Sequence, residues 1–132
     1  MSIVFGRSVV DWMEQRLGEP FRGEALGLGL VRSGMLVAGV AFHDRQYHNV
    51  HASIVALPGS LTKQFMKAIF HYPFNQLKVN RITVCVRRSN EASSKLAQRM
   101  GFSLEGIQRK GYPDGEDKFI FGMLKEECKW IS

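Results

Sequence analysis

The side chains of this sequence that could carry chemistry lie mainly in two stretches, one in the middle of the chain and one nearer its C-terminal end. In the first, His51 and Ser53 alternate along the apolar run VHASIVAL, residues 50–57, so both are expected on one face of a strand. A histidine can accept a proton near neutral pH, and His51 is therefore the preferred candidate for a general base. A structural role for His51 is the alternative, and His43 and His48 lie just upstream.

The second stretch, RRSNEASSKLAQRMGF, is typical of a short helix that follows a strand. Asn90 is a favourable N-cap residue, Ser93 occupies the third helical position, and Gly101 suits a left-handed C-terminal turn. These signals predict a helix over residues 90–101 without invoking any function. A capping role and a binding role are therefore both open for Asn90 and Ser93.

A Pro-Gly-Ser turn at residues 58–60 connects the strand around His51 to another helix. The apolar spacing predicts this helix over residues 60–72, with Ser60 as its N-cap and Pro73 at its exit. A helix N-terminus presents free amides and a partial positive charge, which suits a phosphate group. The same turn would also form in a protein that binds no phosphate, so both interpretations stay open.

Composition favours one globular domain over the whole chain, residues 1–132, with a formal net charge of +6. The basic residues are scattered, so a nucleic-acid partner is not expected, although the charge suits anionic ligands. Cys85 and Cys128 lack the spacing of a metal site, so no metal is expected. With no apolar run of membrane-spanning length and no signal peptide, we expect a reducing, cytoplasmic location without membrane contact.

The elements that must position these residues are predicted by hydrophobic periodicity and turn signals. Ser8 is the expected N-cap of the first helix, Ser33-Gly34 predicts a two-residue hairpin turn, and the small residues Gly27, Gly29 and Gly39 suggest a helix packed closely on that hairpin. The order indicates an α/β (α+β) fold with a mixed sheet. Strands are expected at 3–5, 25–32, 35–44, 50–57, 81–86, 102–112 and 117–124, and helices at 8–18, 60–72 and 90–101.

The C-terminal half of the chain resembles the GNAT family of N-acetyltransferases. The resemblance rests on Asn90-x-x-Ser93, Leu96, Gly101-Phe102, Glu105-Gly106 and Asp117, followed by FGML. It is similar to the branch that acetylates ribosomal-protein N-termini, and also to small phage and prophage acetyltransferase-like proteins. The resemblance implies a twisted, mixed sheet of six to seven strands with helices on both faces, in which the fourth and fifth strands splay apart.

This resemblance implies acetyl-CoA as the cofactor, with its pantetheine arm between strands 50–57 and 81–86. The residues implied to bind it are Val55, Ala56, Leu57, Gly59, Ser60, Leu61, Thr62, Lys63, Asn90 and Ser93. The segment PGSLTKQ lacks the glycine pair that the family usually places before the helix. We therefore expect a weaker pyrophosphate site than is usual for the family.

The resemblance also suggests catalytic and acceptor roles. Ser93 could interact with the departing sulfur, because Ala97 stands where many family members carry a tyrosine acid. Tyr112 could contact the acceptor or the thiolate. Ser53 and Glu105 would line the acceptor groove, with a salt bridge to an arginine as the alternative for Glu105.

Two functions follow from these observations. The first is an N-acetyltransferase that moves the acetyl group of acetyl-CoA to a primary amine, on a protein N-terminus, a lysine or a small molecule, by direct attack in a ternary complex. The second is a catalytically weak or inactive phage or prophage protein that uses the fold as a binding or virion-associated module. Apolar residues expected to be exposed on the last strands, such as Phe119 and Phe121, make a homodimer conceivable.

Overall fold

The computed structural model describes residues 1–131 and contains a seven-stranded mixed sheet, in agreement with the expected fold class. The strand order is β1-β2-β3-β4-β5-β7-β6. The strands are β1 Ser2–Phe5, β2 Ala25–Arg32, β3 Met35–Gln46, β4 Asn49–Ala56, β5 Arg81–Arg87, β6 Ser103–Gln108 and β7 Lys118–Leu124. The α-helices are α1 Arg7–Leu17, α2 Lys63–His71 and α3 Glu91–Met100, with short helical turns at Tyr72–Gln76 and Lys125–Glu127.

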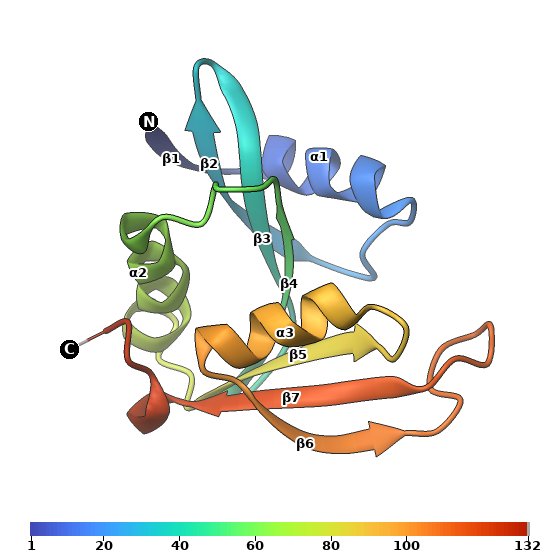
Figure 1. Cartoon of the computed structure of the whole chain (residues 1–132). Helices are drawn as coiled ribbons and strands as arrows, with labels where there is room; N and C mark the ends of the chain where they lie inside the picture. The colour runs from blue at the N-terminus through green and yellow to red at the C-terminus, as the bar shows by residue number, and fades with distance from the viewer. Residues whose placement is uncertain (132) are drawn as a thin grey trace.

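Strands β4 and β5 pair only at their beginnings. The parallel ladder joins Asn49 to Arg81, Val50 to Ile82, and His51 to Thr83, and it ends there although both strands continue. Figure 1 shows the two strands diverging from this common point, with α3 lying near the opening between them. The expected splay of the fourth and fifth strands is therefore confirmed. Below, the region in which β4 and β5 continue beyond this point without pairing is called the slot.

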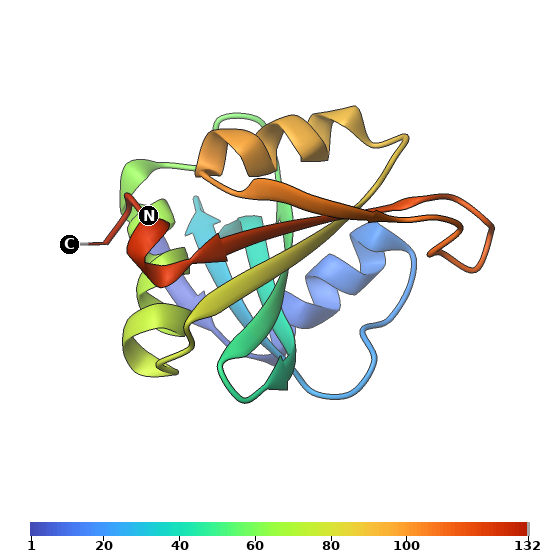
Figure 2. The same ribbon diagram turned by 90° about the horizontal axis from the view of Figure 1, so that it is seen from below.

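Helices cover both faces of the sheet, because each face buries its own apolar side chains. The larger cluster packs α2 and α3 against side chains such as Phe42, Ile82 and Val84. A smaller cluster packs Val9 and Met13 of α1 on the opposite face. Figure 2 shows α1 and α2 separated by the strands of the first half of the sheet.

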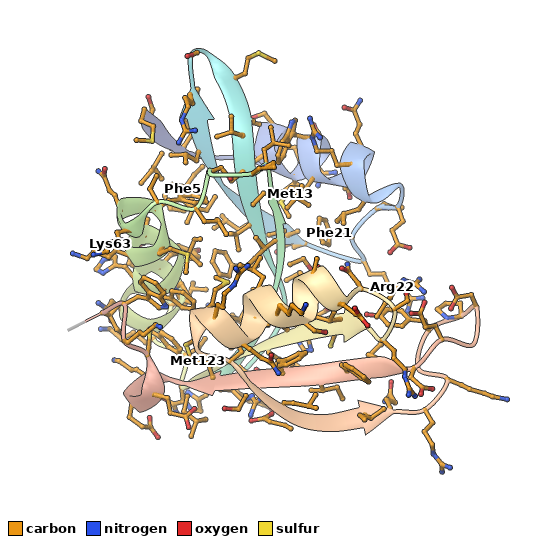
Figure 3. The ribbon with its side chains drawn as sticks, viewed as in Figure 1. Phe5, Met13, Phe21, Arg22, Lys63 and Met123 are labelled. Atoms are coloured by element: carbon orange, nitrogen blue, oxygen red, sulfur yellow. The ribbon has the colours of Figure 1, made fainter. Side chains whose placement is uncertain are left out.

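The glycines of the β2–β3 hairpin allow α1 to approach the sheet closely, as the sequence suggests. A Cβ atom at Gly29 would lie 2.8 Å from Val9 Cγ2, and one at Gly39 would lie 3.0 Å from the Met13 side chain. Met13 extends from α1 toward the sheet in Figure 3. The Ser33-Gly34 turn has positive φ at both residues (54° and 76°), as a type I′ hairpin turn requires.

Two predicted helix starts are wrong. Helix α1 begins at Arg7 after Gly6, which has a φ of 144°, and no side chain caps it, so Ser8 lies inside the helix. Helix α2 begins at Lys63, and its N-cap is Thr62, whose side chain accepts a hydrogen bond from the Phe65 amide. In both places a nearby serine satisfied the sequence rule, but the first turn closes at a different residue.

The chain does not leave the helix at Pro73 either. It continues through a π-helical turn over Tyr72–Gln76, in which the Leu77 amide donates to the Tyr72 carbonyl. Proline lacks an amide hydrogen, and the wider turn accommodates its ring without ending the helical path. Strand β6 is also shorter than expected and ends at Gln108, with a register shift between Leu104 and Gly106.

The expected exposure of the last strands is wrong. Phe121 is 1% exposed, and Phe119 packs against the main core. Strand β7 lies between β5 and β6, so its side chains have neighbours on both sides, whereas the edge strand β6 exposes Leu104 and Ile107. None of the helices in the described part of the chain combines the length and apolar character needed to cross a membrane.

Candidate functional site

The slot presents backbone groups of β4 that have no strand partner. The Leu57 amide donates to the Val37 carbonyl of β3, and an antiparallel ladder alternates its bonds from one residue to the next. The odd-numbered residues of β4 therefore bond to β3, and the amides of Ile54 and Ala56 point toward the side from which β5 has departed. Of the predicted cofactor residues, Val55 directs its side chain to the α1 cluster, and Ala56 packs against the main core.

The segment between β4 and α2 uses its hydroxyl groups internally. Ser60 is 1% exposed, and its hydroxyl donates to the Leu57 carbonyl at 2.6 Å. The Thr62 hydroxyl accepts from the Phe65 amide. Gly59 has a φ of 76° at the turn, and Leu61 packs against the core. The proton of the Ser60 hydroxyl is therefore used inside the protein, whereas the Thr62 hydroxyl keeps its proton for a further acceptor.

The start of α2 still offers an anion two backbone donors and a charge. The amides of Lys63 and Gln64 belong to the first helical turn, where no carbonyl of the same helix can accept from them. The exposed Lys63 side chain projects from α2 away from the sheet in Figure 3. The donors that this segment can offer a phosphate are therefore its backbone amides, the Thr62 hydroxyl and one lysine.

Helix α3 carries the predicted Asn-x-x-Ser pair at its N-terminus. The Ser93 amide donates to Asn90 Oδ1 at 3.1 Å, so Asn90 is an N-cap as expected. The neighbouring Ser94 has a buried Oγ without a hydrogen-bond partner in the described structure. Such an orphan hydroxyl is uncommon in a folded protein and marks a place where a ligand or water can bond. Ser93 was a predicted site residue, whereas Ser94 was not.

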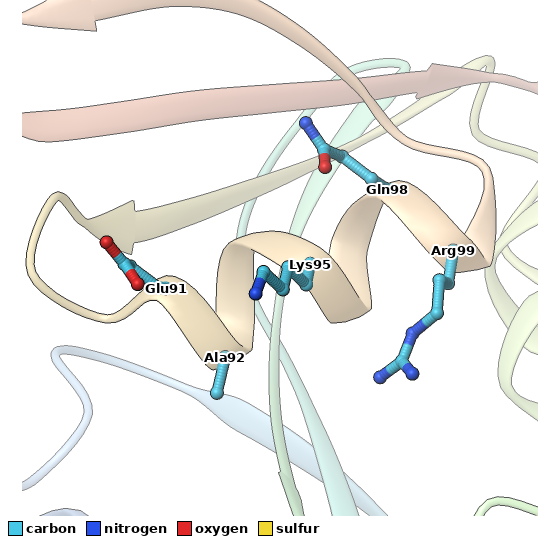
Figure 4. A pocket seen from close by; sticks show the side chains of 5 residues that line it. All are labelled: Glu91, Ala92, Lys95, Gln98 and Arg99. Carbon is cyan, nitrogen blue, oxygen red and sulfur yellow. The ribbon is translucent and has the colours of Figure 1, made fainter.

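A recess on the outer surface of α3 was also missed. It is lined by Glu91, Ala92, Lys95, Gln98 and Arg99. In Figure 4, Ala92 and Arg99 project from α3 away from β6 and β7, whereas Gln98 projects toward the opposite side. The spacing of Ala92, Lys95 and Arg99 places them on one helical face, and that pattern could have identified them from the sequence. The two cations suit an anionic ligand.

His51 lies at the last paired position of β4, where the slot begins. Burial is the main reason that its pKa is lowered, and the nearby His43 lowers the pKa further. Its Nδ1 atom is buried and, within the structure described, lacks a hydrogen-bond partner. A neutral imidazole with a free ring nitrogen is able to accept a proton.

Ser53 lies on the same face as His51, as predicted, and bonds across to β3. Its Oγ is 3.0 Å from His43 Nε2, and His43 Nδ1 is 2.8 Å from a carboxylate oxygen of Asp44. The His43 ring packs between those of Phe21, at a centroid distance of 5.2 Å, and His51, at 5.9 Å. The contact of His43 with Ser53 was not predicted from the sequence, because a cross-strand pairing joins residues that are distant in the chain.

Tyr112 lies on the other side of the slot, beside the outer half of β5. Its ring stacks under the Arg87 guanidinium at 4.2 Å and near the Lys118 ammonium at 4.9 Å. Burial raises the pKa of Tyr112, and the adjacent Cys85 raises it further. Burial likewise raises the pKa of the Cys85 thiol, which makes this cysteine a poor nucleophile near neutral pH.

Glu105 forms the salt bridge that the sequence analysis kept as its alternative role. Its carboxylate is 2.7 Å from Arg81, which also donates to Asn49 and Thr83. These residues belong to the paired beginning of β4 and β5, where the slot is closed. Glu105 therefore supports the closed end of the slot through Arg81. No group of three or more metal-ligating side chains is assembled among residues 1–131.

Comparison with known proteins agrees with this geometry. Residues 35–119 match the family model of the acetyltransferase (GNAT) domain. The chain is 32% identical over 109 residues to a putative ribosomal N-acetyltransferase of Bacillus subtilis, an alignment that covers 75% of this chain and 59% of the Bacillus protein. The chain thus spans less than two thirds of the length of that relative.

Solved structures share the fold at low sequence identity. A spermidine N-acetyltransferase chimera from Vibrio cholerae superposes with a TM-score of 0.75 at 13% identity, over 96% of this chain and 98% of that one. A GNAT-family acetyltransferase from Bacillus anthracis gives a TM-score of 0.67 at 21% identity, over 89% and 73% of the two chains. The family match over residues 35–119 and the divergence of β4 from β5 lead to one conclusion: this chain belongs to the GNAT acetyltransferase family.

Proposed function

We propose that this protein is an N-acetyltransferase that moves the acetyl group of acetyl-CoA to a primary amine by direct attack in a ternary complex. The observation that carries the proposal is the end of the β4–β5 ladder at His51 and Thr83, beyond which both strands continue without pairing. A sheet rarely leaves central backbone groups unpaired, so a polar ligand that lies along β4 would satisfy them. The arm of acetyl-CoA that carries the thioester can lie along β4, and its carbonyl oxygens can accept hydrogen bonds from these amides.

The surrounding residues can supply the chemistry that amide formation requires. The amides of Ile54 and Ala56 are placed to donate to a thioester carbonyl oxygen as negative charge develops on it. His51, whose lowered pKa keeps it neutral at pH 7, can take the proton from an incoming ammonium group. Ser93 or Tyr112 can donate a hydrogen bond to the departing sulfur.

The acceptor would approach on the α1 face of the sheet. His51 and Ser53 lie there on one side of the slot, and Tyr112 lies on the other. The relatives suggest two acceptor classes, a protein N-terminus by analogy with the Bacillus protein and a polyamine by analogy with the Vibrio structure. Both are primary amines, and we infer that the acceptor of this chain is one as well.

A catalytically weak or inactive phage-type binding module is the second candidate. It is favoured by the segment before α2, because the buried Ser60 hydroxyl already donates to the Leu57 carbonyl inside the protein. That arrangement leaves two amides, the Thr62 hydroxyl proton and Lys63 for the pyrophosphate. The two candidates therefore differ in the affinity for acetyl-CoA.

Calorimetric titration with acetyl-CoA separates them. We expect saturable binding, and we expect Lys63→Glu to weaken it roughly three- to tenfold, because a repelling charge then stands at the start of α2. Lys67→Glu is the matched control one turn further along the same helix and should bind like the wild type. If the titration gives no binding heat at millimolar acetyl-CoA and equilibrium dialysis also detects no binding, the transferase proposal is contradicted and the binding module is favoured.

A further inference from the structure

Ser53, His43 and Asp44 form a constellation to which the proposed amine transfer assigns no proton transfer or covalent step. The distance from Ser53 Oγ to His43 Nε2 is 3.0 Å, and that from His43 Nδ1 to the Asp44 carboxylate is 2.8 Å. Both distances fall within the range of about 2.6–3.2 Å expected for a nucleophile, its base and the group that orients the base. The three side chains come from two adjacent strands, β3 and β4.

Hydrogen-bond chemistry fixes the roles within this constellation. A carboxylate only accepts, so the bond to Asp44 requires the proton of the His43 ring to sit on Nδ1. In the neutral ring Nε2 is then an acceptor, and the Ser53 hydroxyl must donate to it. This tautomer is the one that allows an imidazole to withdraw a proton from a serine. Contacts of the ring with Phe21 and His51 hold it in place.

Ser53 also has an oxyanion donor beside it. The pairing of β4 with β5 ends at His51, and Ser53 is the next residue of β4 whose side chain lies on the α1 face. The next residue, Ile54, directs its amide toward the slot, away from β3. In serine hydrolases the amide of the residue after the nucleophile is a usual oxyanion donor. A carbonyl placed in the slot would thus meet a nucleophile and a donor from consecutive residues.

We propose that Ser53, His43 and Asp44 give this protein a serine-dependent hydrolase activity toward activated esters and thioesters, with acetyl-Ser53 as the intermediate. Ser53 Oγ bonds to the acyl carbon while its proton passes to His43 Nε2. The bond from carbon to the leaving oxygen or sulfur then breaks, and that atom takes the proton from the imidazolium. A water molecule then gives a proton to His43 Nε2 and bonds to the acetyl carbon, the bond from that carbon to Ser53 Oγ breaks, Ser53 Oγ takes the proton back from the imidazolium, and acetate leaves. The activity needs neither an amine nor the coenzyme part of acetyl-CoA, so it does not depend on the proposed function.

The test uses p-nitrophenyl acetate with the full chain, in the absence of coenzyme A and of any amine. We expect a burst of nitrophenol, a mass increase of one acetyl group, and localisation of that group to Ser53 by peptide mapping. Ser53→Ala and His43→Asn should lower the hydrolysis rate by at least about 100-fold, the range attributed to acid–base assistance. The exposed Ser103→Ala and His48→Asn are the matched controls and should leave the rate unchanged.

Ser53→Cys keeps the result interpretable if the alanine variant folds poorly, because a thiol at this position should still become acylated. Wild-type rates in Ser53→Ala, or an acetyl group mapped to a lysine or to Cys85, would overturn the proposal. An absence of acetyl-CoA binding would count against the transferase but would leave this ester experiment unaffected. Normal amine transfer together with an unacylated Ser53 would refute the triad alone.

Discussion

Replacing Ile54 with proline tests whether the backbone of β4 acts on the thioester. The alternation of the β3–β4 ladder predicts that the Ile54 amide makes no bond to β3 and faces the slot. Proline removes this one hydrogen and is tolerated where a strand amide has no ladder partner. Ile54→Ala is the matched control, because it loses the same partly buried side chain but keeps the amide.

The expected size of the effect follows from the role of the amide. Loss of one donor to a developing oxyanion lowers kcat by roughly 100- to 1,000-fold, about 2.7–4 kcal/mol of transition-state stabilisation. The affinity for acetyl-CoA should change much less, because a neutral thioester carbonyl accepts a weaker hydrogen bond than an oxyanion does. Val55→Pro should behave differently, since its amide belongs to the β3 ladder and its loss should destabilise the fold.

The assay is thiol release from acetyl-CoA in the presence of an amine that the wild type acetylates, chosen from polyamines and peptides with free N-termini. Urea unfolding of each variant separates lost catalysis from lost structure. Equal turnover in Ile54→Pro and Ile54→Ala would show that this amide does not polarise the carbonyl. Equal stability of Ile54→Pro and Val55→Pro would show that the assigned direction of the ladder is wrong.

Three further predictions concern stability. Gly29→Ala should lower the free energy of unfolding in urea by about 1–3 kcal/mol, because the new methyl group would lie 2.8 Å from Val9 Cγ2. Adding Val9→Ala in the same chain should recover part of that loss. If the two substitutions lower the free energy of unfolding by strictly additive amounts, this packing is contradicted. Asn90→Ala should lower the free energy of unfolding by about 1 kcal/mol through loss of the α3 cap, while Asn90→Asp should retain the wild-type stability. Equal urea denaturation midpoints for these two variants would refute the capping assignment. The folded protein disfavours protonated His51, so the unfolded chain binds more protons than the folded protein as the pH falls below 6.5. The free energy of unfolding of the wild type should therefore decrease in that pH range, and that of His51→Gln should decrease less. Parallel plots of unfolding free energy against pH for the two proteins would refute the assignment.

Features with local causes were predicted correctly from the sequence. The Asn90 cap and the left-handed Gly101 depend on residues within one or two helical turns, and the Ser33-Gly34 turn depends on its own backbone angles. The alternation that places His51 and Ser53 on one face is a property of any strand. The seven-stranded mixed sheet and its splayed strands followed from these elements together with the family resemblance.

Features that depend on distant neighbours were not predicted. Phe121 was expected to be exposed and is buried, because β7 lies between two strands that the sequence does not order.

The chemistry of the site divides in the same way. The sequence by itself determined which residues could accept protons, cap helices or turn the chain, because those properties belong to single side chains and their nearest neighbours. Only the tertiary structure decided that Ser53 meets His43 and that β4 parts from β5 after His51. Those contacts depend on the pairing and twist of strands far apart in the chain, and many pairings satisfy the same local pattern.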